Sequence, residues 1–387
     1  MDPTGATARR FPLVARTRPA CTPLDERVAD LTDRARAAEA ARDLAGAAAV
    51  HNLAALLASD AGLPDLARTW CHRQAKAHLR SHPLGAQGAR HALEPLVNLA
   101  RLHIRNGEGE QAYRLVDSLY TAVSARTTAV IDDVEVPARL TRTVEDHKDV
   151  RHWLWAVLLA TGAKALATAG RWDKARDRLA EHKGIGRRML DGRQVAVIAR
   201  LVDRDTATAL DLLNDTEPGD PTENAVTACL TLLATGQHPH PEGLLDRYRD
   251  LDPTRPGLTV FHTRLALSFI DATGTATDPS ARTLATELIA RTLTSPDGYA
   301  ARDLLTHPGC AALLTTRQHD QMKGQVTACG LGSGTLPARL REDLDAALDA
   351  TEQTIRDLAG TQPTAPQPPA GIEKAEARRK PPDSRPT

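Results

Sequence analysis

Apolar residues recur along most of the chain at the three- and four-residue spacing that places them on one face of an α-helix. Short polar turns interrupt these runs, each with a glycine that is followed five residues later by an alanine. This unit occurs at Gly62 and Ala67, at Gly107 and Ala112, and at Gly170 and Ala175. Glycine suits the turn because a helix end commonly needs a residue at positive φ, and alanine lets two helices come close. We therefore predict antiparallel helix hairpins, joined at glycine and packed across alanine.

The same pattern continues, less regularly, through the second half of the chain. Two apolar runs close on Gly236 and Gly274, and another helix is expected around Ala209. The stretch TVED from Thr143 has the residues of a capping box. Four helix starts are marked by a capping residue followed by proline: Thr22-Pro23, Asp220-Pro221, Asp278-Pro279 and Ser295-Pro296. We expect about five to seven helix pairs in total.

Three segments lack helical periodicity. Residues 1–21 are expected to be an extended or disordered lead, and residues 127–138, around TTAVIDDVEVP, an extended insertion that forms a short hairpin or a loop. Residues 361–387 are rich in proline and charge without aromatics, so we predict a disordered tail. The predicted helical repeats then occupy residues 22–126 and 139–360.

Composition favours an all-α fold. Hydrophobic residues make up 41% of the chain but aromatics only 3%, so the interior must consist mainly of Leu, Val, Ile and Ala. The apolar stretch from Trp153 contains Lys164 and makes a poor membrane span. Five widely spaced cysteines without a C-x-x-C motif fit a reducing cytoplasm rather than a disulfide framework. We therefore expect a cytoplasmic protein without membrane contact.

The charge balance argues against direct nucleic-acid binding. Lys plus Arg and Asp plus Glu both number 49, which gives a formal net charge of zero. Proteins that bind DNA or RNA usually carry a clear excess of Lys and Arg over Asp and Glu. We therefore expect no direct contact with nucleic acid.

The predicted hairpins resemble tetratricopeptide repeats (TPR), and the first two resemble the longer kinesin-light-chain type. The resemblance rests on NLA in the first helix of a pair, on the glycine and alanine at the turn, and on His82-Pro83 in the following loop. It extends over residues 37–120 and 155–182. It implies a superhelical stack of hairpins, a TPR-like α-solenoid, whose concave face binds a protein or peptide. The composition, rich in Ala, Arg, Leu and Thr, is similar to that of high-GC, actinobacterial-type proteins.

Polar residues on the first helices of the pairs are the candidate contacts for such a ligand. Asn52 and Asn98 stand where asparagine is frequent in the resembled family, and an amide both donates to and accepts from a peptide backbone. Asn98, Arg101 and Arg105 fall at i, i+3 and i+7, so they share one stripe of a helix. Such a stripe suits a carboxylate or acidic ligand. The alternative is a merely solvated helix face.

A second candidate is the densest aromatic spot of the chain, formed by Trp153 and Trp155 beside Arg151 and His152. Two tryptophans that are two residues apart on a helix cannot face the same core. We expect one to pack while the other is partly exposed or covered by residues 127–138. This helix is therefore a candidate for partner contact, with plain packing as the alternative.

No motif in the sequence predicts a cofactor, a metal or catalysis. Cys71, His78 and His82 share a helix face, but Pro83 takes His82 out of helical conformation and no carboxylate accompanies them. The stretch ACGLGSGTL lacks the spacing and the preceding strand of a phosphate-binding loop, so we expect a flexible connection between helices. Neither a G-x-S-x-G elbow nor an H-E-x-x-H helix occurs.

The leading hypothesis is a non-catalytic adaptor or regulatory protein that binds a protein or peptide on its concave face; homo-oligomer formation stays open. The second is a ligand-sensing regulator similar to repeat-containing transcription factors. It would lack its own DNA-binding domain, because a helix-turn-helix needs about 60 residues and the helices begin by Thr22. The third is an enzyme of a biosynthetic cluster on an α/α scaffold, which requires a deep pocket with convergent titratable groups.

Overall fold

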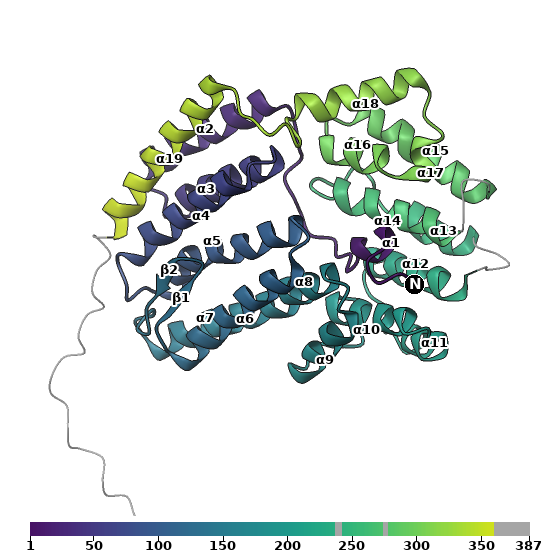
Figure 1. The fold of residues 1–387 in the computed structure, drawn as a ribbon, viewed down its shortest axis with the longest axis horizontal. Helices are drawn as coiled ribbons and strands as arrows, with labels where there is room; N and C mark the ends of the chain where they lie inside the picture. Colours follow the sequence, from purple (N-terminus) through teal and green to yellow (C-terminus); the bar gives the residue numbers. More distant parts are fainter. Residues whose placement is uncertain (237–241, 274–277, 360–387) are drawn as a thin grey trace, which may run out of the picture.

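Helices make up most of the structure, a computed structural model that describes residues 1–236, 242–273 and 278–359 (Figure 1). Within these ranges the fold is all-α, as predicted, and successive helices pack as hairpins. The pairs are α3 (Leu44–Asp60) with α4 (Pro64–Leu79), α5 (Ala86–Arg105) with α6 (Gly109–Ala125), α8 (Ala163–Thr168) with α9 (Trp172–Glu181), α10 (Asp191–Val202) with α11 (Thr206–Asn214), α12 (Pro221–Thr235) with α13 (Glu242–Arg249), α14 (Thr259–Ala272) with α15 (Pro279–Thr294), and α16 (Gly298–Leu305) with α18 (Thr316–Ala328).

The remaining elements lie outside these pairs. They are α1 (Ala6–Arg10), α2 (Leu24–Ala41), β1 (Ala129–Ile131) with β2 (Val134–Val136), α7 (Val144–Val157), which continues through the π-helical turn η1 (Leu158–Gly162) into α8, α17 (Pro308–Ala311) and α19 (Ala338–Ala359). The two strands pair antiparallel, so the predicted insertion is a short hairpin. Within the described ranges, no helix combines the length and the apolar character that crossing a bilayer requires.

The glycine and alanine positions of the predicted hairpin are confirmed. The three turn glycines have positive φ, with values of 78° at Gly62, 81° at Gly107 and 72° at Gly170. The alanines five residues later have no exposed surface: Ala67, Ala112 and Ala175 are all 0% accessible. Glycine is favoured at these turns because a side chain strains a backbone at positive φ. The buried alanines keep the two helices of each pair close.

Local capping signals place most, but not all, of the predicted helix starts. Asp220 and Asp278 each accept two backbone N–H groups at the start of their helices. Thr143 and Asp146 form the predicted capping box of α7. The start at Thr22-Pro23 is wrong, because α2 begins at Leu24 and has no side-chain cap. Ala209 lies on α11 as predicted, whereas Gly274 is outside the described residues.

The start predicted at Ser295-Pro296 is also wrong, for a physical reason. Asp297 accepts the backbone N–H of Tyr299 at 2.9 Å, so α16 begins one residue after Asp297. Ser295 instead ends α15. Ser and Asp are about equally good capping residues, so the start is decided by position: Ser295 is taken up by the end of α15, and Asp297 is the next residue able to cap.

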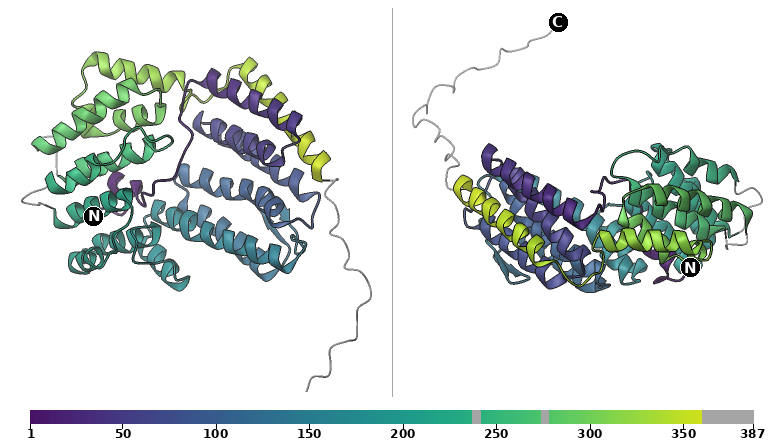
Figure 2. Two further views of the ribbon diagram at one scale, coloured as in Figure 1. Left: turned by 180° about the vertical axis from the view of Figure 1, so that it is seen from behind. Right: turned by 90° about the horizontal axis from the view of Figure 1, so that it is seen from above.

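The first helices of successive pairs contact one another, which is compatible with a helical repeat. The contacts join α3 with α5, α5 with α8, α8 with α10, α12 with α14, and α14 with α16. Figures 1 and 2 show two groups of helices, with α2 to α7 and α19 in one and α9 to α18 in the other; α8, the end of the continuous rod that begins with α7, lies where the two groups meet. A separate hydrophobic cluster fills the interior of α2 to α4 with α19. The largest cluster joins the helices of the other group to α6 and to the first residues of the chain.

The last described helix returns to the first long helix. α19 packs against α2, α3 and α4, so residues from both ends of the helical region share one core (Figure 1). Leu344 and Leu348 are fully buried there, beside Val28 and Leu31. The predicted tail, residues 361–387, lies outside the described residues.

The lead predicted for residues 1–21 is only partly right. It is extended over much of its length, but Ala6–Arg10 form the short helix α1. Ala8, Phe11 and Cys21 are 0% exposed, so the lead is part of the core and not a free arm. Figures 1 and 2 show it running between the two groups of helices before it enters α2. We call residues 1–23 the N-terminal segment.

Candidate functional site

The predicted stripe on α5 is joined across the helix interface to α3. Asn98 Nδ2 donates to Oδ1 of Asn52 at 2.9 Å, and Arg101 Nη1 donates to Oδ1 of Asn98 at 2.7 Å. Arg101 also pairs with Glu94 at 3.4 Å and keeps 49% of its side chain exposed. The structure therefore brings Asn52, Asn98 and Arg101 together in one polar row, on the first helices of two successive pairs.

The fourth residue of the predicted set, Arg105, is engaged by a buried carboxylate. Its Nη1 donates to Ser59 Oγ at 2.7 Å and to Asp60 Oδ1 at 3.1 Å. Asp60 also accepts from Arg27 at 2.8 Å and from the hydroxyl of Tyr299, with only 3% of its side chain exposed. Burial lowers the pKa of Arg105, and the charge of Asp60 opposes that shift. We call Asp60, Arg27, Arg105 and Tyr299 the Asp60 cluster; it joins α2, α3, α5 and α16.

The aromatic spot on α7 stands apart from this row. Trp153 is half-buried against the core that α7 shares with α4, α5, α6 and the strand pair, whereas Trp155 stacks on His152 with ring centroids 5.5 Å apart. Arg151 is exposed. Among the described residues, no hydrogen bond, ion pair or ring contact links Arg151, Trp153 or Trp155 to the Asn52–Asn98–Arg101 row. The structure therefore does not join the two predicted surfaces into one site.

A binding arrangement that the sequence did not predict lies between the N-terminal segment and α10. Gln194 on α10 is fully buried. Its Oε1 accepts the backbone N–H of Leu13 at 2.6 Å, and its Nε2 donates to the carbonyl of Leu13 at 2.7 Å. A carboxamide that bonds in both directions to one residue recognises the backbone of an extended chain rather than a particular side chain.

Two further side chains hold backbone carbonyls of the same segment. Lys164 on α8 donates to the carbonyls of Arg9 at 2.6 Å and of Phe11 at 2.8 Å. Trp172 Nε1 on α9 donates to the carbonyl of Pro3 at 2.9 Å. Burial lowers the pKa of Lys164 to about 7, with the nearby Arg264 acting in the same direction.

Carboxylates fix the cationic side chains of the segment at two points. Asp271 on α14 accepts from Thr7 Oγ1 and from Arg10 Nη1, each at 2.5 Å, and lies 2.9 Å from His307 Nε2. Burial alone would raise the pKa of Asp271, but its partners His307 and Arg10 hold that pKa well below the usual range. Further along, Arg16 pairs with Asp191 at the start of α10 at 2.6 Å.

The apolar side chains of the segment enter the large core. Phe11 is 0% and Leu13 is 5% exposed, and both belong to the cluster formed by α6 and the helices from α8 onward. We call the cleft between α8, α10 and α14 that holds residues 9–16 the inner groove. The sequence signals were a lone charged residue within an apolar run, Lys164 in ATGAKALATAG, and a polar residue at the start of one, Gln194 in RQVAVIARLV. That signal marks a buried polar group but does not reveal its partner.

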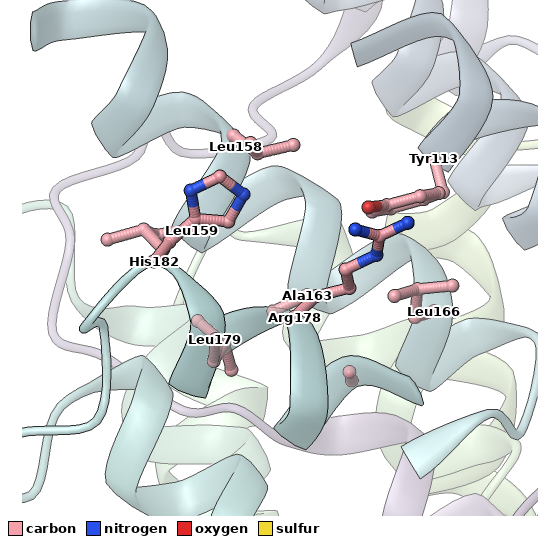
Figure 3. Close-up of a pocket in the computed structure, with 9 residues that line it drawn as sticks. Tyr113, Leu158, Leu159, Ala163, Leu166, Arg178, Leu179 and His182 are labelled. Atoms are coloured by element: carbon pink, nitrogen blue, oxygen red, sulfur yellow. The ribbon is translucent and has the colours of Figure 1, made fainter. Parts of the chain in front are cut away.

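A small cleft lies between α6, α8 and α9, with leucines as its floor (Figure 3). Leu158, Leu166 and Leu179 line it together with Tyr113 and Arg178. In Figure 3 the ring of Tyr113 and the guanidinium of Arg178 lie side by side. Burial raises the pKa of Tyr113 to about 12, so its hydroxyl stays protonated at neutral pH. This lining favours contact with an apolar group over proton transfer.

The residues considered for a metal do not converge. α4 ends at Leu79, and His82 lies beyond it with Nδ1 2.8 Å from the carbonyl of Leu79. Cys71 and His78 are buried within the helix bundle. In the described part of the chain, no group of three or more His, Cys, Asp or Glu side chains is placed to hold a metal ion.

The glycine-rich stretch after α18 docks on the turn between α3 and α4. The backbone N–H of Gly332 donates to the carbonyl of Asp60, and that of Gly334 to the carbonyl of Ala61, both at 2.8 Å. Both glycines have positive φ, 67° and 70°. The stretch connects two helices, as expected, but it does not run free as a flexible link, because its N–H groups hold a neighbouring turn.

Comparisons with known proteins add no further identification. No family model matches the chain, and neither the curated proteins nor the solved structures contain a match. The assignment of a role therefore depends on the geometry of the row and of the inner groove.

Proposed function

We propose that this chain is a non-catalytic protein of TPR-like helix hairpins, an adaptor or regulator that binds an extended segment of a partner protein. The glycine turns and buried alanines support the family resemblance, and the composition supports an actinobacterial-type origin. The observation that carries the proposal is the two-way hydrogen bond between Gln194 and Leu13. Through this bond α10, the first helix of its hairpin, binds the backbone of an extended segment.

The partner segment docks on the polar row formed by Asn52, Asn98 and Arg101. The row lies on α3 and α5, which are first helices like α10, and its side chains are partly exposed. The amides of Asn52 and Asn98 bond a peptide backbone, and Arg101 pairs with a carboxylate of the ligand in place of Glu94. The proposed ligand is therefore an extended, acidic peptide segment.

The test is selection of random 12-residue peptides displayed on phage against the immobilised full chain. We expect enrichment of peptides with Asp or Glu at a fixed position. Asn98→Ala with Arg101→Ala should weaken binding of the enriched peptides by about tenfold or more, because charged hydrogen bonds contribute about 1.5–3 kcal/mol each. Arg105 is not substituted, because its removal would take away one of the cations that compensate the buried Asp60 carboxylate.

The matched control is Asn106→Ala with Arg114→Ala, which removes the same residue types at exposed positions of the neighbouring turn and helix. This control should bind the enriched peptides like the wild type. Failure of the wild type to enrich any peptide family would overturn the proposed function. Equal binding by the row variant and the control would leave the function but remove the row as its site.

A further inference from the structure

The inner groove holds its occupant in the way that a receptor holds a peptide. The groove bonds the backbone of residues 9, 11 and 13. It also pairs with the cations of Arg10 and Arg16 and packs against the apolar side chains of Phe11 and Leu13. The cations lie at the two ends of this stretch and the apolar groups between them. The contacts thus define a linear pattern, Arg-apolar-x-apolar-x-x-Arg.

We propose that the inner groove is a binding site for extended basic–apolar peptides of this pattern, that residues 9–16 occupy it as an intramolecular ligand, and that a partner segment with the same pattern replaces them. The site is distinct from the row on α3 and α5 and does not depend on the function proposed for that row.

The polar groups of the groove require an occupant of this class. Among the described residues, the ammonium group of Lys164 donates to the carbonyls of Arg9 and Phe11 and to no other acceptor. Asp191 pairs with the cation Arg16, and Asp271 with Arg10. Asp191 and Asp271 are partly buried, with 18% and 26% of their side chains exposed, and His307 also contacts Asp271. The occupant that fits these groups best therefore brings carbonyls to Lys164 on α8 and cations to α10 and α14. An extended peptide with two arginines supplies all of these groups.

The chain provides a place where the occupant can separate from the rest. Thr17, Pro19 and Ala20 are exposed, whereas the residues around them are anchored. The Arg18 guanidinium lies 4.3 Å from the ring centroid of Tyr299, and the backbone N–H of Cys21 donates to Asp297. Thr17 therefore marks the point up to which residues 9–16 can leave the groove, while residues 18–21 keep the segment attached beside it. Such a tether gives the intramolecular ligand a high effective concentration. A competing peptide can therefore replace it only if the peptide binds tightly or if the binding of residues 9–16 has been weakened.

The test uses the full chain and a fluorescent synthetic peptide with the sequence of residues 8–17, ARRFPLVART, blocked at both ends. Wild-type protein should bind it weakly, because its own segment competes. Arg10→Ala with Phe11→Ala weakens that segment, and this variant should bind the peptide at least about tenfold more tightly. A scrambled peptide of the same composition should not bind. Adding Gln194→Leu to the weakened variant removes the backbone contact and should abolish binding.

Hydrogen exchange on the wild type tests the same proposal without a variant. The amide of Leu13 should exchange through local opening, at least about tenfold faster than the amides in the middle of α10. Excess ARRFPLVART should speed that exchange further by holding the open form, and the scrambled peptide should not. A Leu13 amide that exchanges only with the slowest amides of α10 and ignores the peptide would overturn the proposal. So would a folded weakened variant that binds both peptides equally.

Discussion

Among individual residues, Gln194 is fully buried, and within the described ranges its side-chain amide bonds only to backbone groups, those of Leu13 and Met189. Gln194→Leu keeps a side chain of similar size but leaves the N–H and carbonyl of Leu13 without partners. Each buried polar group left unsatisfied costs about 1–3 kcal/mol. We therefore expect the free energy of unfolding to fall by about 3 kcal/mol in urea denaturation. The exposed substitution Gln87→Leu should change it by less than about 0.5 kcal/mol. Equal losses in the two variants would contradict this account.

A second prediction at this scale concerns two buried histidines. His51 is 0% and His78 is 3% exposed, and neither ring nitrogen of His51 has a hydrogen-bond partner among the described residues. Burial lowers the pKa of both to about 3; the charge of Arg73 adds to the effect on His51, and those of His91 and His51 to the effect on His78. An unfolded histidine takes up its proton near pH 6.5, whereas these folded ones do so only near pH 3.

Lowering the pH from 7 to 5 therefore favours the unfolded state, by about 2 kcal/mol for each histidine. In urea denaturation at both pH values, His51→Leu should lose about 2 kcal/mol less stability than the wild type over this interval. Gln87→Leu is the control, because it changes an exposed position without a titratable group and should leave the pH dependence unchanged. An unchanged pH dependence in His51→Leu would show that the histidine is not buried in its neutral form.

At the scale of helices and turns, three glycines separate conformational from packing requirements. At Gly109, where α6 begins, an added Cβ would lie 2.2 Å from the carbonyl oxygen of Ala165 on α8. At Gly107, two residues earlier, nothing lies within 4 Å but φ is 81°. At Gly324, in the middle of α18, there is open space and no positive φ. An added methyl group therefore clashes with backbone at Gly109, strains the chain at Gly107, and does neither at Gly324.

We expect Gly109→Ala to lower the free energy of unfolding by about 3 kcal/mol, because α6 and α8 must move apart. Gly107→Ala should cost about 1 kcal/mol for its positive φ. Gly324→Ala should stabilise the protein by roughly 0.5–1 kcal/mol, because alanine loses less backbone entropy in a helix. Urea denaturation of the three variants gives the order directly. A loss at Gly107 as large as at Gly109 would mean that close helix packing is not what selects glycine at Gly109.

What the sequence could predict at this scale follows the range of the interactions. The glycine turns, the capping box of α7 and the strand pair at residues 129–136 each depend on neighbours a few residues away, and the structure has all of them. In the Asn52–Asn98–Arg101 row, Asn98 and Arg101 are one helical turn apart, and Asn52 and Asn98 are one repeat apart. The assembly of the row could therefore also be anticipated. The pairing of Arg105 with Asp60 spans the same repeat, 45 residues. The contribution of Tyr299 to that cluster could not be anticipated, because it reaches Asp60 from 239 residues away, after several helices have packed.

The inner groove shows the same limit more strongly. Lys164 is 153 residues from Phe11, Gln194 is 181 from Leu13, and Asp271 is 261 from Arg10. No local period relates such positions. A lead without helical periodicity resembles a disordered arm in sequence, since its stability comes from groups supplied by distant helices. Composition therefore reports how the segment behaves alone and not what the rest of the chain offers it.

At the scale of the whole molecule, the contact of α19 with α2 decides whether the succession of helices is closed on itself. In an open stack the two ends would each leave an apolar face exposed. Here the buried side chains of α19 cover α2 and α3, and Arg73 on α4 pairs with Asp349 at 2.5 Å and with Glu352. The two ends of the helical region thus stabilise each other, and a change in α19 should be felt in α2.

Leu348→Ala tests this closure. Leu348 is fully buried between α19 and the first helices, and removing such a leucine costs about 2–5 kcal/mol. Because the cavity lies in the closing contact, hydrogen exchange in α2 should speed up together with that in α19, while the amides of α12 keep their rates. Leu190→Ala is the matched control, since Leu190 is 47% exposed and its loss should cost less than about 0.5 kcal/mol. If α19 loses protection while α2 keeps it, the two ends fold independently, and the helices form an open row to which α19 is merely attached.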